Sequence, residues 1–289
     1  MTSRADFHCH STASDGVLSP TELVDLAHKQ GVRIMALTDH DSNEGLAEAQ
    51  AAADRHSDFT LIPGVELGTD IPGAEVHVLG YFMDPANAEL QETLSHLRET
   101  RRGRGERTVE RLREMGMDVT WEQVQRIAGD AAVGRPHVAQ ALVEGGHVAT
   151  VKEAFDKYIA RNGPAYVERE KMTPAEAVGT ITGLGGVPCL AHPCDVTKTD
   201  EQLYPILSEL KAAGLVGMEV YYKMYEPPVV KRLLAAASKF DLLPLGGSDY
   251  HGIFGQEEPL PGGMYSPLPD ASIDALMELG RERVAARSG

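Results

Sequence analysis

The chain has 289 residues, 42% of them apolar and 24% charged, which is enough for one sizeable globular core or a core with a small accessory domain. Its formal net charge of −16 argues against binding to long nucleic acid. No run of 18 or more apolar residues occurs, so the sequence predicts no membrane span.

The sequence favours a cytoplasmic protein. The start, MTSRADFHCH, lacks the apolar core of a secretion signal. The three cysteines, Cys9, Cys189 and Cys194, form no CxxC pair, so a disulfide scaffold is improbable and a reducing compartment fits better. The sequence predicts no particular oligomeric state.

Short apolar runs of strand length recur along the chain, and most are followed by a helical pattern. They lie at 5–10, 32–40, 59–67, 74–82, 186–193, 216–222 and 242–251. Such alternation is typical of βα units in a mainly parallel sheet or barrel. The linker at 68–73 is too short for a helical crossover, so the third and fourth runs are predicted to pair as a hairpin.

Two helix starts are clearly marked. The stretches SPTE at 19–22 and TPAE at 173–176 each combine an N-cap hydroxyl, a proline at the first helical position and a glutamate that completes a capping box. Gly31 is expected to end the first of these helices.

Residues 88–165 interrupt the strand–helix alternation. They predict consecutive helices at roughly 88–115, 121–128, 135–144 and 150–161. We therefore expect an inserted helical cap at 88–165 and a barrel formed by 1–87 and 166–289. Seven arginines between 98 and 113 alternate with glutamates, which indicates a solvated, ion-paired helix face.

A side chain able to bind a cation lies near one end of each apolar run. In chain order these are His8, His10 and Asp15, then Asp39, His40, Glu66, His77, His192, Glu219, Asp249 and His251. In an α/β barrel the C-terminal strand ends meet at a common mouth. The side chains are therefore expected to converge there.

Spacing supports this convergence. His8 and His10 lie two residues apart and share one face of a strand, as do Asp249 and His251, whereas Cys9 points to the other face and is expected to pack in the core. An isolated histidine on an apolar run is more often a hydrogen-bonded core residue than a ligand. The combination of so many at matching strand ends favours a metal site.

Two acidic residues leave alternatives open. Asp39 adjoins His40 and so points to the opposite side; it either caps the following helix or orients a ligand. For Glu219, support of another residue, substrate contact and buried pairing are all compatible with its position.

These blocks resemble the motifs of a known family. DFHCHSTASDG, ALTDHD, PGVE, EVHVLGY, LAHP and GSDYH are similar, in order, to motifs of the PHP (polymerase and histidinol phosphatase) family. The resemblance spans both ends of the chain and omits mainly the helical insertion. It implies an α/β fold, a distorted (β/α)7 TIM-like barrel, and a phosphoesterase site with two or three divalent ions.

The resemblance also implies a ligand set for each ion. His8, His10, Glu66 and Asp249 would hold the first ion. Asp15, His40 and His251 would hold the second. Glu66, as a bridge, would hold the third with His77 and His192. Histidine and carboxylate ligands without a thiolate suit Mn²⁺, Fe²⁺ or Zn²⁺, with Mn²⁺ preferred here.

The hypothesis that follows is a metal-dependent phosphatase in which a metal-bridging hydroxide attacks a phosphate monoester. Within the family, the size of the chain and the stretches AVGRPHVAQALVEGG and KYIARNGPAYV resemble a bacterial subgroup of 3′,5′-nucleoside bisphosphate phosphatases. The implied substrate is a small nucleotide such as pAp. Arg135, at an expected helix start, is predicted to grip its second phosphate, and His137 is a candidate proton donor.

Three other functions compete with this hypothesis. Part of the same subgroup trims short RNA from the 5′ end, and an acidic surface permits short oligoribonucleotides. Histidinol-phosphate hydrolysis is a close enzymatic rival. A non-catalytic metal-binding accessory module would bind ions without hydrolysis.

Overall fold

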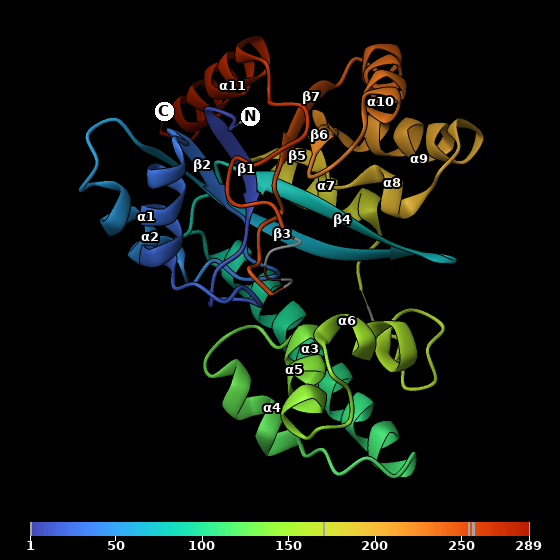
Figure 1. Cartoon of the computed structure of the whole chain (residues 1–289). Helices are drawn as coiled ribbons and strands as arrows, with labels where there is room; N and C mark the ends of the chain where they lie inside the picture. The colour runs from blue at the N-terminus through green and yellow to red at the C-terminus, as the bar shows by residue number, and fades with distance from the viewer. Residues whose placement is uncertain (1, 170, 254, 256–257, 289) are drawn as a thin grey trace.

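The fold is known from a computed structural model that describes residues 2–169, 171–253, 255 and 258–288. A single sheet of seven strands, in the spatial order β1 to β7, forms a nearly closed barrel (Figure 1). The strands are β1 (Ala5–Cys9), β2 (Ile34–Leu37), β3 (Thr60–Ile71), β4 (Ala74–Tyr81), β5 (Val187–Leu190), β6 (Gly217–Tyr222) and β7 (Leu243–Gly247). All seven apolar runs thus form strands, and the predicted α/β barrel is confirmed.

Helices in the connections between strands, together with one helix after the last strand, cover the outside of the barrel (Figure 1). They are α1 (Pro20–Gln30), α2 (Leu46–Ala53), α7 (Pro174–Gly183), α8 (Pro193–Val196), α9 (Asp200–Ala213), α10 (Pro227–Lys239) and α11 (Asp270–Ser288). Both predicted capping boxes are present, at Ser19–Glu22 and Thr173–Glu176, and Gly31 ends α1 with φ 97°. Among the residues described, no helix combines the length and apolar character that a membrane crossing needs.

The fourth strand departs from a parallel barrel. β3 and β4 pair antiparallel from Gly64–Tyr81 to Ile71–Ala74, as the short linker predicts, and β4 is also antiparallel to β5. The other pairs are parallel. One consequence concerns His77, which lies in the middle of β4, opposite Gly68, rather than beyond a strand end.

Asp6 closes the barrel between β1 and β7. Its buried carboxylate accepts hydrogen bonds from the backbone and hydroxyl of Ser248, at 2.9 and 2.6 Å, and from the backbone of Gly262 at 2.7 Å. A bridge between Cys9 and Tyr250 continues the contact. The C-terminal ends of strands β1 and β7, near which candidate site residues lie, are thereby held side by side.

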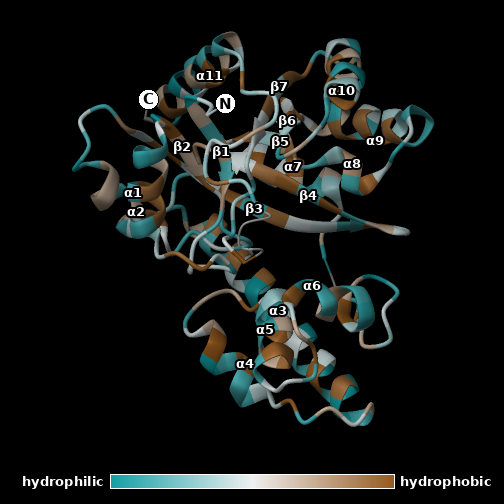
Figure 2. Ribbon diagram, viewed as in Figure 1, coloured by the Kyte–Doolittle hydropathy of each residue, from teal (hydrophilic) through white to brown (hydrophobic). Residues whose placement is uncertain are grey.

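The apolar side chains of the strands form the core. Phe7, Ile62, Leu79 and Leu245 are among its fully buried members, and helices from the outer layer pack against it. Cys9 packs in a second cluster with α1 and α2, in agreement with its expected role. The strands are correspondingly apolar along much of their length in Figure 2.

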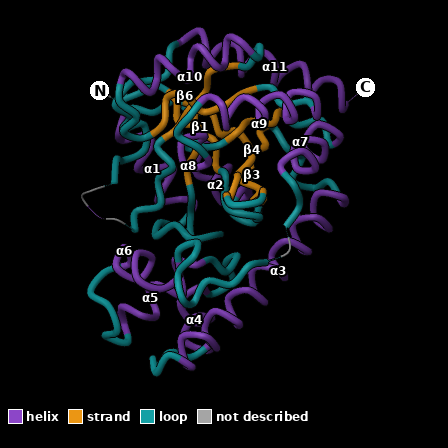
Figure 3. The backbone as a smooth tube through the Cα atoms, turned by 90° about the vertical axis from the view of Figure 1, so that its right-hand side faces the viewer, coloured by secondary structure: helices purple, strands orange, loops and turns teal. Residues whose placement is uncertain are grey.

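Residues between β4 and β5 form a group of helices that projects from the barrel (Figures 1 and 3). They are α3 (Ala88–Glu114), α4 (Trp121–Ala128), α5 (Arg135–Glu144), α6 (Val151–Ala154) and a π-helical turn, η1 (Phe155–Ile159). This group has a hydrophobic cluster of its own, centred on Leu112, Val138 and Leu142. The four helices expected here are found, the last one divided into α6 and η1.

Candidate active site

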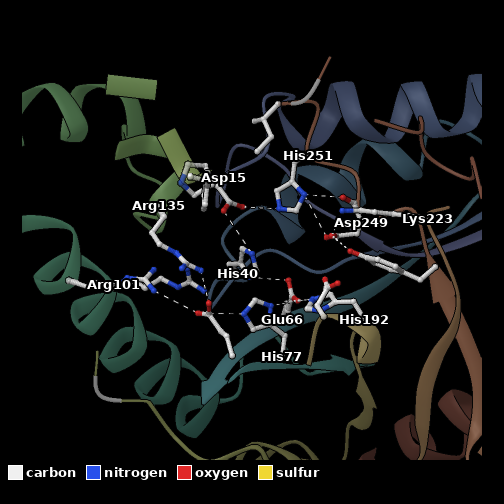
Figure 4. A pocket seen from close by; sticks show the side chains of 17 residues that line it. Asp15, His40, Glu66, His77, Arg101, Arg135, His192, Lys223, Asp249 and His251 are labelled. Carbon is white, nitrogen blue, oxygen red and sulfur yellow. Dashed lines mark hydrogen bonds and ion pairs between the residues drawn. The ribbon is translucent and has the colours of Figure 1, made fainter. Parts of the chain in front are cut away.

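The candidate ligands converge at one mouth of the barrel (Figure 4). β1 and the loop after it carry His8, His10 and Asp15; β2, β5 and β7 are followed by His40, His192, and Asp249 with His251; β3 and β4 contain Glu66 and His77. Seven of these nine line a cavity of about 310 Å³, and His8 and His10 lie fully buried beneath it.

The first group is His8, His10, Glu66 and Asp249, whose ligand atoms all lie within 4.8 Å of one another. Both Nε2 atoms lie 3.2 Å from Glu66 Oε2, and they lie 3.1 and 3.2 Å from Asp249 Oδ1. Within the described residues, neither Nε2 atom nor Glu66 Oε2 has a hydrogen-bond partner of acceptable geometry. Ligands bonded at about 2.1 Å to one cation are separated by similar distances. The four side chains therefore fit a divalent metal.

The second group contains Asp15, His40 and His251, and the structure adds His10 to it. His251 Nε2 lies 3.3 Å from Asp15 Oδ1, and His40 Nε2 lies 3.9 Å from Asp15 Oδ2. Asp15 Oδ1 is a further buried oxygen without a hydrogen bond among the described residues. This set also fits a metal ion, and His10 lies between the two groups.

The third predicted group, Glu66 with His77 and His192, lies around Glu66, but the set whose ligand atoms all lie within 4.8 Å of one another contains His40, Glu66 and His77 and not His192. Glu66 Oε1 lies 2.8 Å from His77 Nδ1 and 3.2 Å from His192 Nε2, and its Oε2 lies 2.9 Å from His40 Nδ1. Glu66 thus contacts residues of all three groups, as a bridging carboxylate would.

Three residues of the mouth have positive φ angles, a backbone conformation that residues other than glycine rarely adopt. The φ angles are 27° for His192, 38° for Lys223 and 48° for Asp249. Such conformations persist only where the surrounding fold fixes them, and they concentrate at functional sites. Lys223 Nζ lies 2.6 Å from Asp249 Oδ2, and Tyr222 donates to the same oxygen at 2.8 Å, so the Asp249 carboxylate is held in place.

Glu219 supports two candidate ligands from behind. Its Oε1 lies 3.1 Å from His8 Nδ1, and its Oε2 accepts a 2.7 Å hydrogen bond from the His192 backbone. The side chain is fully buried and does not line the cavity. Of the alternatives left open by the sequence, support of other residues fits, and substrate contact does not.

We expect Glu219→Gln to weaken metal binding about 10- to 100-fold, because the amide keeps the shape but loses the charge that increases the basicity of His8. Titration of the metal-free protein with Mn²⁺ against a competing chelator measures this. Glu209→Gln, on the exposed face of α9, is the matched control. Equal Mn²⁺ affinity in both variants would contradict the supporting role.

Asp39 holds the loop that carries Asp15. Its carboxylate accepts from the backbone and hydroxyl of Ser11, at 2.8 and 2.7 Å, and from the Ser14 hydroxyl at 2.6 Å. The helix that follows, α2, has Gly45 as its N-cap and no side-chain cap. The capping alternative for Asp39 is therefore wrong, and the orienting one fits.

Burial and neighbouring charges shift the pKa values of Glu66 and of the histidines that contact it. Burial lowers the pKa of His40 to about 4, although Glu66 and Asp15 oppose the shift. For His77, burial acts in the same direction, but the Glu66 carboxylate outweighs it and the pKa rises to about 9. The imidazoles in turn outweigh the desolvation of Glu66 and hold its pKa well below the usual range. Glu66 is thus a carboxylate anion at neutral pH, the form that a metal ligand requires.

The expectation of a solvated arginine face on α3 is wrong for Arg101 and Arg104. Their exposed fractions are 5% and 4%, and both line the same cavity as the histidines. Arg102, between them, is exposed and pairs with Glu106 as expected. The reason is helical spacing: Arg101 and Arg104 lie on the buried face of α3 together with Leu97, Thr108 and Leu112. That spacing is visible in the sequence and was the signal that could have identified them.

Asp41 fixes Arg101. The Asp41 carboxylate, fully buried, accepts from Arg101 Nε at 2.5 Å and from Arg169 at 2.8 Å, and it also accepts from the backbone of Gly68. Burial disfavours the charge of Asp41, but the two guanidinium groups outweigh it and the pKa of the carboxyl falls far below its usual value. Arg101 joins α3 to the loop after β2 through this contact.

Arg135 and Arg104 meet at Glu75. Arg135 donates to Glu75 Oε2 at 2.6 Å, and Lys171 pairs with Oε1, from which Arg104 is 3.8 Å away. The Arg135 guanidinium lies 5.8 Å from the ring centre of Phe155 and 5.9 Å from that of Tyr166. Arg135 therefore lines the cavity at a fixed position, as Figure 4 shows.

His137 does not line this cavity. Its Nδ1 accepts a 2.9 Å hydrogen bond from the Gly134 backbone, and its ring lies in an adjacent cavity. Of the cations that do line the cavity, Lys223 was missed by sequence reasoning, because a single lysine after a strand carries no recognisable pattern.

Comparison with known proteins agrees with this geometry. The model of the PHP domain family matches residues 6–168. A 5′-3′ exoribonuclease of Haemophilus influenzae is 36% identical over 251 residues, covering 87% of this chain and 91% of that protein. A 3′,5′-nucleoside bisphosphate phosphatase of Chromobacterium violaceum is 34% identical over 257 residues, covering 85% and 86%.

A solved structure agrees over almost the whole chain. A protein from Bifidobacterium adolescentis, described as a candidate metal-dependent phosphoesterase, superposes with a TM-score of 0.85 at 32% identity, covering 96% of both chains. The barrel, the converging imidazoles and carboxylates, and these relatives lead to one conclusion. The chain belongs to the PHP family of metal-dependent phosphoesterases.

Proposed function

We propose that the enzyme removes the 3′-phosphate from nucleoside 3′,5′-bisphosphates such as pAp, giving the 5′-monophosphate and phosphate. One observation carries the proposal: a single cavity of about 310 Å³ joins the histidine–carboxylate groups to a cluster of buried and partly buried cations. A substrate with two phosphates on one ribose matches these two regions.

The cation cluster carries surplus positive charge. It contains Arg101, Arg104, Arg135, Arg169 and Lys171, against the carboxylates of Asp41 and Glu75. In a chain with a net charge of −16, three uncompensated positive charges in one buried place favour an anionic ligand. Arg104 has the least compensation, since the carboxylate oxygen with which it pairs, Glu75 Oε1, is 3.8 Å away. We assign the second phosphate to Arg104 and Arg135, whose forked donors suit phosphate oxygens.

The reacting phosphate would lie at the other end of the cavity. We propose that two or three divalent ions are held there by His8, His10, Asp15, His40, Glu66, His77, Asp249 and His251, with His192, which contacts Glu66 at 3.2 Å, as a further ligand. Such ions activate water and neutralise phosphoryl charge when bound. The donor set, nitrogen and carboxylate oxygen without thiolate, suits Mn²⁺ best and Fe²⁺ or Zn²⁺ next. Lys223 lines the same end and adds a positive charge next to the reacting group.

We also propose that residues 88–165 act as a cap on the barrel formed by 1–87 and 166–289. The cap contributes Arg101, Arg104 and Arg135 to the cavity, whereas the candidate metal ligands all come from the barrel. Substrate selection would then depend mainly on the cap and the reaction on the barrel.

A second candidate is 5′-3′ removal of nucleotides from short RNA, the activity named for the Haemophilus relative. A 5′-phosphorylated oligonucleotide offers the same two phosphates, and the negative net charge disfavours long strands only. Histidinol phosphate is less favoured, because its single phosphate would leave the arginine cluster without a partner.

We place the enzyme in the cytoplasm. Cys9, Cys189 and Cys194 are buried and unpaired, which suits a reducing compartment. Its partners would be small nucleotides.

Phosphate release tests the proposal. After chelation and addition of Mn²⁺, we expect hydrolysis of pAp to exceed that of histidinol phosphate and of single-phosphate nucleotides. A 5′-phosphorylated trinucleotide, assayed in parallel by product size, measures the second candidate. A preference for histidinol phosphate over pAp would reject both.

Arg104→Met separates binding of the second phosphate from the reaction itself. We expect kcat/KM for pAp to fall about 100-fold, because charge-assisted hydrogen bonds to phosphate contribute about 1.5–3 kcal/mol. Hydrolysis of p-nitrophenyl phosphate, which has no second phosphate, should change less than about threefold. Arg102→Met, on the exposed side of the same helix, is the control. Equal losses on both substrates would contradict the assignment.

A further inference from the structure

We propose that a second cavity, between the cap and the loop after β1, binds the nucleobase of the substrate. This inference rests on the proposed function and adds the part of the nucleotide that the two phosphate regions leave unassigned. The cavity measures about 340 Å³, at the lower end of the range for pockets that bind small ligands.

The two cavities adjoin. Asp15, Pro136 and Ile253 line both of them, so the second cavity borders on a candidate metal ligand. Arg135 lies in the first cavity, and its neighbours Pro136 and His137 lie in the second. A single helix start, that of α5, therefore borders the phosphate region and the second cavity together.

The loop after β1 and the cap approach closely here. The backbone of Ala132 donates to that of Ala13, and a side chain in place of Gly134 would meet Asp15 Oδ2 at 3.1 Å. Gly16 is equally constrained, since an added Cβ would lie 2.5 Å from the His10 carbonyl oxygen. These contacts make the second cavity, referred to below as the slot, a fixed feature of the fold.

The walls suit a flat, weakly polar ring. Val17, Ile127, Ala128 and Val151 contribute apolar surface, and Val17 is 51% exposed. Apolar and ring faces are the usual partners of an unstacked base. Phosphate or sugar alone would gain little from such a surface, so the base is the part of the nucleotide that fits it.

The cavity offers a side-chain amide to read the edge of the base. The side-chain amide of Gln140 lines the cavity, and no hydrogen bond to it is found in the described parts of the chain. An amide donates and accepts at once, which matches the paired donor and acceptor on a base edge. His137 has less to offer, because its Nδ1 is already occupied by the Gly134 backbone.

The test measures binding of a product rather than turnover. The 5′-monophosphate of 2-aminopurine riboside is titrated into the Mn²⁺-loaded enzyme, and its fluorescence reports whether the base enters a pocket. Ribose 5-phosphate, which has the phosphate but no base, is the competing ligand. We expect the base-bearing product to bind at least about tenfold more tightly in the wild type.

Two variants locate the site. Gln140→Ala should weaken the 2-aminopurine product about tenfold, as the loss of one buried hydrogen bond predicts. Val151→Trp, which fills the slot, should weaken it at least as much and abolish the fluorescence change. Neither variant should alter the affinity for ribose 5-phosphate. Gln125→Ala, on the exposed face of α4, is the matched control.

The outcomes separate this inference from the proposed function. Equal affinity for the two ligands in the wild type, or unchanged binding in both variants, would overturn the base slot even if pAp is hydrolysed. Loss of ribose 5-phosphate binding in both variants would also overturn it, since the effect would not be confined to the base. Failure of the wild type to hydrolyse pAp or the trinucleotide would reject the proposed function instead.

Discussion

Asp249→Ala and His10→Ala are each expected to reduce phosphate release about a thousandfold or more. Both side chains belong to the first candidate metal group, and His10 lies within reach of the second as well. Loss of one ligand removes stabilisation of charge on the phosphoryl group that amounts to several kcal/mol, and about 4 kcal/mol corresponds to a thousandfold in rate. The measurement is kcat on pAp and on p-nitrophenyl phosphate with Mn²⁺ present.

Metal content distinguishes this explanation from misfolding. Each variant should bind fewer Mn²⁺ ions per chain than the wild type, whereas its thermal unfolding should remain cooperative. His96→Ala and Asp58→Ala remove the same side-chain types from exposed positions and should keep full activity. Full activity in both Asp249→Ala and His10→Ala would disprove a metal-dependent mechanism at this site.

Asp41→Asn is expected to destabilise the fold by about 3–5 kcal/mol. The Asp41 carboxylate forms ion pairs with both Arg101 and Arg169, and all three side chains are buried. Its removal would leave two buried guanidinium groups without a compensating charge. Urea unfolding at pH 7 measures the change.

The same contact has a defined pH dependence. The pKa of Asp41 is depressed in the folded state, so its contribution to stability is present above the unfolded pKa of about 4 and is lost as the pH falls below that value. The difference between wild type and Asp41→Asn should therefore narrow in acid. Asp58→Asn, in an exposed pair with Arg33, should cost about 0.5 kcal/mol at most. A loss below about 1 kcal/mol for Asp41→Asn would contradict the buried ion cluster.

The positions of the strands and most helices were predictable because each depends on local pattern. The seven apolar runs, the capping boxes at Ser19 and Thr173, and the hairpin at 68–73 were found where expected. A short linker permits only an antiparallel return, and a capping box satisfies donors within its own turn. Convergence of the histidines that follow β1, β2, β5 and β7 was predictable from the same patterns, because strand ends of a parallel barrel share one mouth, whereas His77 reaches the site from the middle of the antiparallel strand β4.

Several contacts of the site could be identified only from the tertiary structure. Which alternative held for Glu219 and Asp39 depended on partners 211 and 25 to 28 residues away in the chain. The placement of Arg104 beside Glu75, and of Lys223 beside Asp249, joins segments that no periodicity connects.

By itself, the sequence determined the barrel, the helical insertion and the set of side chains able to bind metal, since these follow from hydrophobic period and local capping. Only the tertiary structure decided which charges meet, because the distance between two side chains from different segments depends on how the whole chain packs. Arg101 and Arg104 illustrate both parts. Their helical face was readable from the spacing of the neighbouring leucines, but the cavity they line exists only where the insertion meets the barrel.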